Sequence, residues 1–210
     1  MSQATTLPDL YDMLLGEVSG CPPVLVLQHL QQALRKFCED SEAFTEKMTA
    51  INLVAEQVDY TLAPAHTSCE IRRIAEVWIR TSTDVTDGLD GTLQDFDKYE
   101  FDPVTKVLTL DDTIEPQTAV TSGLVVKVVL VPFLKTDLHA TTAISAAFLN
   151  LWAETVLARA CYTLKRMSRK AWSDPQLAGV HLGDYNQGLT RALTEAQGFK
   201  NRSEQDGFSA

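Results

Sequence analysis

The apolar side chains of this chain follow a helical period at both ends and a strand-like period between them. Residues 23–40 place apolar side chains along one stripe of a helix. From Ala43 to Pro132 the apolar runs are short, rich in β-branched and aromatic residues, and separated by turn residues. A helical period returns at about Thr141. A chain that leaves the helical pattern and then resumes it is expected to hold its strands as an insertion between helices.

We therefore predict an α+β fold. An antiparallel α-helical bundle, made of an N-terminal helix and a C-terminal helical hairpin, carries a central inserted antiparallel β subdomain. The helical subdomain is predicted over residues 1–42 and 133–198, the β-rich subdomain over 43–132, and a C-terminal tail over 199–210. The tail is largely polar and is expected to be disordered.

Two more segments have a helical pattern. Leu7–Val18 is predicted to form a short helix, and Gly20 follows it as a stop signal. Thr141–Met167 is predicted to form one long helix. Its predicted core stripe consists of Ile144, Phe148, Leu151, Thr155, Ala158 and Cys161.

The inserted part contains one strand that is apolar on both faces. “LVVKVVLV”, residues 124–131, is interrupted only by Lys127 and is predicted to be the most buried strand. The segment “YEFDPVTKVLTL” is predicted to form a hairpin with its Asp-Pro pair in the turn. Ser122 and Gly123 are expected to form a turn ahead of the buried strand.

The segment “RKAWSDPQLAG”, residues 169–179, ends one helical pattern and begins the next. Asp174 is expected to cap the new helix, Pro175 to occupy its first position, and Gly198 to end it. The apolar face of this helix is predicted to hold Leu177, Leu182, Tyr185, Leu189, Ala192 and Ala196. Trp172 is predicted to fill the corner, where Trp172→Ala would cost about 3–5 kcal/mol if the side chain is buried. Trp172, Asp174 and Pro175 together form the predicted structural elbow.

Four cations lie at the end of the long helix. They are Lys165, Arg166, Arg169 and Lys170. Cations are favourable at a helix C-terminus because they complement its dipole, and this is the simplest interpretation. A salt contact with another protein is the strongest alternative, and phosphate binding is a further one.

The overall charge argues against tight nucleic-acid binding. The chain has a net charge of −10 and a pI near 4.8, whereas DNA binding needs a basic face. No signal sequence and no membrane-spanning run is recognised, so we expect synthesis in a cytoplasm and no membrane partner. The four cysteines are scattered, and we expect them to be reduced structural thiols. They are Cys21, Cys38, Cys69 and Cys161.

A search for enzyme motifs gives no candidate site. GxSxG, Walker A, GxGxxG and HExxH patterns are all missing from the sequence. His66 and Cys69 are too few ligands for zinc. The acidic segment of residues 84–97 has its first aspartates three apart, which does not fit an EF-hand loop, and a solvated turn-rich loop is favoured. Its acids are Asp84, Asp87, Asp90, Asp95 and Asp97. We predict no catalytic residues, no metal and no cofactor.

Several segments, in this order, resemble the head-to-tail adaptor proteins of tailed bacteriophages, which are also called connector, tail tubular or gatekeeper proteins. The segments are “ALRKFCEDSEAF” (33–44), “DYTLAP” (59–64), “YEFDPVTKVLTLDDTIEP” (99–116), “VKVVLVPFL” (126–134) and “LKRMSRKAWSDPQLAGVHLGDYNQGL” (164–189). The Trp-x-Asp-Pro-x-x-Ala piece is the most specific of these. One departure is that the family's long helix often carries a Gly-Ala pair, where this chain has “TVLARACYTL”.

The resemblance implies a structural virion protein, made in the bacterial host cytoplasm and located in the neck or tail of the virion. It implies a homo-oligomeric ring of twelve subunits between the portal protein and a tail or nozzle protein. DNA would pass through the lumen during ejection without sequence-specific binding. Twelve copies at −10 each would carry about −120 formal charges, and an acidic lumen would let DNA slide. Catalysis is not implied.

With this function, the cations of the corner and the tail are predicted to contact the portal. The predicted interface residues are Lys165, Arg166, Arg169, Lys170, Phe199, Lys200, Arg202 and Phe208. Two alternatives stay open. One is another phage neck or tail-completion protein, and the other is a small cytosolic enzyme whose site assembles from scattered residues.

Overall fold

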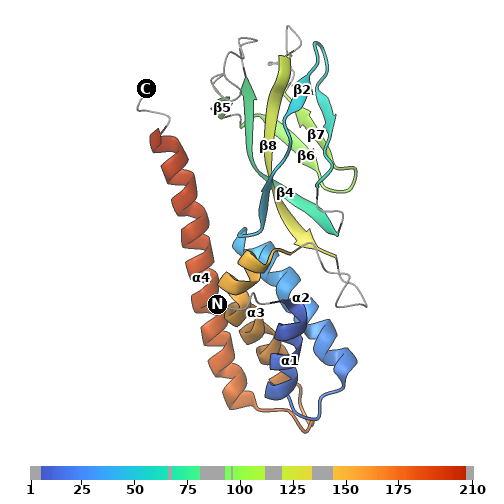
Figure 1. The fold of residues 1–210 in the computed structure, drawn as a ribbon, viewed down its shortest axis with the longest axis vertical. Coiled ribbons are helices and arrows are strands. Elements are labelled where there is room, and N and C mark those ends of the chain that lie inside the picture. Colours follow the sequence, from blue (N-terminus) through green and yellow to red (C-terminus); the bar gives the residue numbers. More distant parts are fainter. Residues whose placement is uncertain are drawn as a thin grey trace. The chain divides into compact units, whose positions relative to one another are not determined.

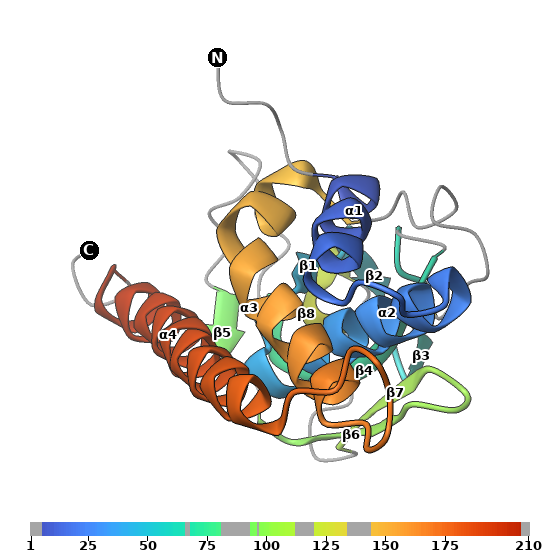
Figure 2. The same cartoon turned by 90° about the horizontal axis from the view of Figure 1, so that it is seen from below.

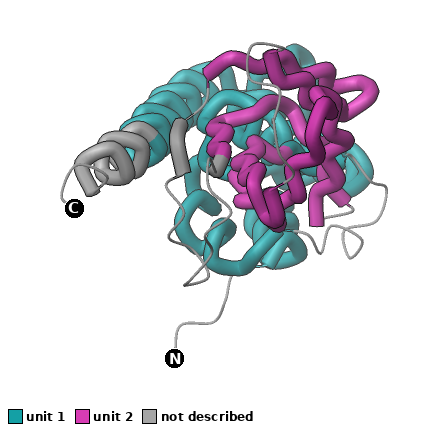
Figure 3. The backbone as a smooth tube through the Cα atoms, turned by 90° about the horizontal axis from the view of Figure 1, so that it is seen from above, with its two compact units in different colours: residues 1–44, 131–210 teal, residues 45–130 magenta. Residues whose placement is uncertain are grey.

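The computed structural model describes residues 6–65, 68–80, 93–95, 97–111, 120–133 and 144–206. The chain forms two compact units, coloured separately in Figure 3. A helical unit combines residues 1–44 with residues 131–210, and a β unit contains residues 45–130. The α+β class predicted from the sequence is confirmed, with helices at both ends and antiparallel strands between them.

The helical unit contains four helices in its described residues (Figure 1). They are α1 (Leu7–Glu17), α2 (Pro23–Ser41), α3 (Ala146–Lys165) and α4 (Pro175–Asp206). At the start of α1, the Asp9 backbone N–H donates to the Thr6 hydroxyl and the Thr6 N–H donates to the Asp9 carboxylate at 2.7 Å. The hydrogen bonds from Thr6 lower the pKa of Asp9 because they favour its charged form. The reciprocal pair fixes where α1 begins.

Helix α3 is the centre of the helical unit and packs against α1, α2 and α4. An aromatic cluster joins it to α2, with the Phe37 ring 5.4 Å from that of Trp152 and 6.1 Å from that of Phe148. The predicted core stripe of α3 was wrong at one position: Leu151 is 49% exposed, and Trp152 is buried beside it. The helix has partners on several sides, so a single stripe does not describe its buried surface.

Helices α3 and α4 make a close contact where Gly188 of α4 faces Thr155 of α3. A Cβ atom placed on Gly188 would lie 2.6 Å from Thr155 Cγ2 and closer still to the Thr155 hydroxyl. The two helices lie side by side along the hairpin in both Figure 1 and Figure 2. Any larger residue at position 188 requires the Thr155 side chain or one of the helices to shift.

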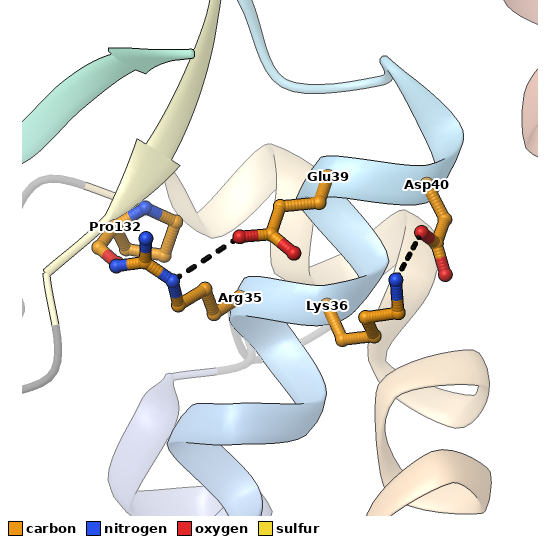
Figure 4. A network of polar contacts seen from close by, with 5 residues as sticks. All are labelled: Arg35, Lys36, Glu39, Asp40 and Pro132. Atoms are coloured by element: carbon orange, nitrogen blue, oxygen red, sulfur yellow. Dashed lines mark hydrogen bonds and ion pairs between the residues drawn. The ribbon is translucent and has the colours of Figure 1, made fainter. Parts of the chain in front are cut away.

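A polar contact less than one turn before Gly188 ties α4 to α2. The buried Tyr185 hydroxyl donates to Asp40 at 3.2 Å, and Asp40 also accepts from Lys36 at 2.7 Å (Figure 4). Burial, followed by the negative charge of Asp40, raises the pKa of Tyr185 well above its usual range. Arg159 of α3 lies 5.1 Å from the Tyr185 ring centre, so three helices meet at this tyrosine.

The strands of the β unit are short except for two. They are β1 (Thr45–Lys47), β2 (Ile51–Leu53), β3 (Asp59–Thr61), β4 (Cys69–Arg80), β5 (Leu93–Asp95), β6 (Tyr99–Asp102), β7 (Val107–Leu110) and β8 (Val120–Pro132). The described strands make a five-stranded sheet in the order β1-β8-β4-β5, with β2 also on β8, and a three-stranded sheet in the order β3-β7-β6. The β6–β7 hairpin, with its Asp-Pro turn, is confirmed.

Strand β8 is mostly buried on both faces, as the sequence predicted. Its one internal charge, Lys127, is paired with Glu76 of β4 at 2.8 Å. The turn predicted at Ser122 and Gly123 is wrong, because both residues lie within β8 at an irregularity opposite β2. The Asn52 side chain accepts from the Ser122 N–H at 2.8 Å, which satisfies a donor that the distorted ladder leaves unpaired.

Three elements also differ from expectation. The long helix predicted over Thr141–Met167 is shorter, because Ser145 caps α3 ahead of Ala146 and the helix ends at Lys165. Strand β5 falls in the acidic segment, where no strand was predicted. Helix α4 continues to Asp206, so Gly198 does not end it and residues 199–206 extend the helix in place of a disordered tail. An internal glycine costs a helix only about 1 kcal/mol, and no proline follows Gly198 to force a stop.

The Gly188 contact gives a direct test of the hairpin. We expect Gly188→Ala to lower the free energy of unfolding by roughly 1–3 kcal/mol, because the added methyl group forces α4 away from Thr155. Gly183→Ala in the same helix is the matched control, since its Cβ would meet nothing within 4 Å. It should instead stabilise the protein by about 0.4–1 kcal/mol. Urea unfolding of both variants measures the difference, and equal effects would contradict the close contact.

Candidate functional site

The turn between α3 and α4 is built by local hydrogen bonds. The Asp174 N–H donates to the Lys165 carbonyl at 2.9 Å, and the Asp174 carboxylate accepts from the Leu177 N–H at 3.0 Å. Pro175 is the first residue of α4. The predicted cap and helix start are therefore confirmed. Arg169 has a φ of 61°, which helps the chain to reverse between the two helices.

Trp172 fills this corner less completely than predicted. Its side chain is half-buried, although its indole nitrogen is shielded and has no hydrogen-bond partner in the described part of the protein. A loss of about 3–5 kcal/mol in the free energy of unfolding is expected for Trp172→Ala only if the side chain is fully buried. Because it is half-buried, we expect a smaller loss.

The predicted cluster of four cations divides into one buried residue and three exposed ones. Lys165 is 6% exposed, and its ammonium donates to the Glu17 carbonyl at 2.9 Å, with the Glu17 carboxylate at 3.9 Å. Glu17 is the last residue of α1, whose terminal carbonyls lack partners within the helix. Lys165 therefore fastens α1 to α3 and is not available to another molecule.

The three exposed cations form what we call the basic turn: Arg166, Arg169 and Lys170. Arg166 donates to the Tyr162 hydroxyl at 2.8 Å. Within the described part of the chain, none of the three is in an ion pair. Of the other predicted interface residues, Phe199, Lys200 and Arg202 lie on the last turns of α4, and Phe208 falls outside the described residues.

A groove of about 800 Å³ lies along α3, bounded by α1 and α4. Figure 2 places α3 between those two helices. The apolar lining of the groove includes Met13 of α1, which is 56% exposed, and Leu151 of α3. Three exposed acids also line it: Glu17, Glu154 and Asp184. We call this the acidic groove. Sequence reasoning missed it, because it placed Leu151 in the core.

Cys161 and His181 both line the acidic groove and are the nearest approach to a catalytic pair. Burial and the charge of Glu17 raise the pKa of the Cys161 thiol to about 11, so the thiol is protonated near neutral pH. The His181 Nε2 atom has no hydrogen-bond partner in the described residues, Cys161 included. A nucleophilic cysteine needs a lowered pKa and a bonded base, and this arrangement supplies neither.

The structure describes only some of the residues named in the thiol and metal predictions. Cys21, Cys38, Cys69 and Cys161 are buried free thiols. In the described residues no group of three or more His, Cys, Asp or Glu side chains is placed to hold a metal ion. Asp84, Asp87, Asp90 and His66 lie outside those residues, as does the Asp95 side chain, and Asp97 is exposed. No described helix combines the length and apolar character needed to span a bilayer.

The chain matches no protein-family model and no curated protein. The adaptor resemblance therefore remains a prediction from the quoted segments. In the structure those segments fall on α2, β3, the β6–β7 hairpin, β8 and the α3–α4 turn.

A substitution of Lys165 tests the contact that joins α1 to α3 beside the groove. We expect Lys165→Ala to lower the free energy of unfolding by roughly 1–3 kcal/mol, because the Glu17 carbonyl loses its charged donor. Lys170→Ala removes a neighbouring exposed lysine and should change stability by less than about 0.5 kcal/mol. Thermal or urea unfolding compares the two variants. Similar small losses in both would show that Lys165 carries no special contact.

Proposed function

We propose that this protein is a structural virion component, a head-to-tail adaptor that forms a ring between the portal and the tail or nozzle of a bacteriophage. The ring would have about twelve subunits, as the resemblance implies. DNA would pass through its lumen. Its work is assembly and sealing, in which binding between surfaces replaces a catalytic step.

The observation that carries the proposal is the exposed acidic groove of the helical unit. A groove that combines exposed apolar side chains with a polar rim is a type of surface at which folded proteins bind other proteins. Met13 and Leu151 are both about half exposed in one groove. The shielded, protonated thiol of Cys161 in the same groove favours a contact surface over a catalytic one.

The charge of the chain is compatible with a DNA conduit. At a net −10 per copy, a ring repels the phosphate backbone more than it binds it. Such repulsion keeps DNA mobile in a lumen. The same charge makes the subunits repel one another, so the contacts between copies must bring local cations against local acids.

The test of this function uses the portal protein encoded by the same genome. Mixing the two proteins and imaging the product by cryo-electron microscopy should give a ring of this chain stacked on one face of the portal. A stable monomer that does not bind the portal would contradict the adaptor proposal. Binding to a tail protein alone would point to another neck or tail-completion role.

A truncation tests the predicted role of the C-terminal segment. Deleting residues 199–210 should weaken portal binding, because it removes Phe199, Lys200, Arg202 and Phe208. The core of the hairpin, including Gly188 and Tyr185, lies before the cut, so the subunit should keep its unfolding midpoint. Pull-down against the portal measures the effect. Full-strength binding by the truncated chain would remove this segment from the interface.

A further inference from the structure

The helical unit carries two exposed surfaces of opposite charge. The acidic groove holds Glu17, Glu154 and Asp184, and the basic turn holds Arg166, Arg169 and Lys170. Glu154 and Asp184 have no ion-pair partner among the described residues, and neither have the three cations. Glu17 is paired with Lys165, and Arg191, which also lines the groove, is paired with Glu195. Among the described residues, each surface therefore still has charged side chains that lack a partner of opposite sign.

The shapes of the two surfaces also correspond. The groove is a concave strip along α3, whereas the basic turn is a short connection that projects beyond the ends of α3 and α4 (Figure 1). The basic turn also carries the half-buried Met167 and Trp172 side chains, which supply apolar surface for Met13 and Leu151. A projecting turn with cations and apolar atoms fits an apolar groove with an acidic lining.

We propose that the acidic groove of one copy receives the basic turn of a second copy of this chain. The inference rests on the proposed ring function and names its contact between subunits. Different surfaces meet, so the contact is head-to-tail, and repeating it through one rotation closes a ring. Each copy then uses its groove for one neighbour and its basic turn for the other.

The proposal changes the partner predicted from the sequence for Arg166, Arg169 and Lys170. The sequence assigned them to the portal, but the structure offers an acidic counterpart on the chain itself. Lys165 takes no part, because it is buried against Glu17. The Lys165 ammonium donates to the Glu17 carbonyl and lies 3.9 Å from the Glu17 carboxylate. The charge of that carboxylate, at the α1 end of the groove, is therefore only partly neutralised.

The first test is a cysteine cross-link between two variants of the full chain, Asp184→Cys and Lys170→Cys. Mixed under mild oxidation, alone and with the portal present, they should give a disulfide-linked pair that neither variant gives alone. The native cysteines are buried, but Cys161 lines the same groove, so both variants also carry Cys161→Ser. Mass spectrometry of the linked peptides identifies the bond. Absence of the mixed pair in both conditions would overturn the proposal.

A charge exchange supplies an independent readout. Glu154→Lys with Asp184→Lys, or Arg169→Glu with Lys170→Glu, should each weaken self-association by about tenfold or more, because each places like charges in contact. Mixing the two double variants should recover a complex, since their reversed surfaces match. Asp97→Lys with Glu100→Lys makes the same change in net charge as the groove variant, on exposed residues of the β unit, and should have little effect. Sedimentation velocity at low and high salt measures all four.

The outcomes separate this inference from the proposed function. A portal-bound ring that forms without the cross-link, and that survives both charge reversals, would refute the groove contact and leave the adaptor function standing. Loss of portal binding in the Arg169→Glu and Lys170→Glu variant, with self-association intact, would assign the basic turn to the portal and also refute it. A cross-linked oligomer that never binds the portal would support the contact and contradict the adaptor role.

Discussion

The close contact between Gly188 and Thr155 sets the geometry of the helical unit. It lets α4 lie directly on α3, nearer than any side chain at position 188 would allow. On another side of α3, the Lys165 ammonium holds the end of α1 through the Glu17 carbonyl. These two contacts fix α4 and α1 on either side of the surface between Leu151 and Cys161. The acidic groove is the part of α3 that neither neighbour covers.

Helix length explains why this surface stays open. Helix α1 has 11 residues and α3 has 20, so at a rise of about 1.5 Å per residue they span about 16 Å and 30 Å. A short helix cannot cover the whole of a long one. Leu151 lies near the start of α3, far along the helix from Lys165, where α1 is anchored. Its exposure follows from the unequal lengths and the position of the anchor.

Local signals in the sequence were sufficient for much of the fold. Asp174 and Pro175 start α4 because a cap and a pre-set φ act on neighbouring residues alone. The β6–β7 hairpin and the doubly buried β8 follow equally from local pattern. Such signals work because the physical cause lies within a few residues of its effect.

The candidate site depends on contacts that no local pattern contains. Lys165 reads as one of four similar cations, and only the end of α1, far away in sequence, selects it for burial. Leu151 belongs to an apolar stripe, and its exposure follows from the helix that fails to reach it. The groove consists of side chains that the neighbouring helices leave exposed, and local sequence patterns do not reveal which side chains these are. Water solvates the charges of both surfaces in the free subunit. A second copy of this chain is the simplest molecule that offers each surface a complement of opposite charge, which is the contact that we propose.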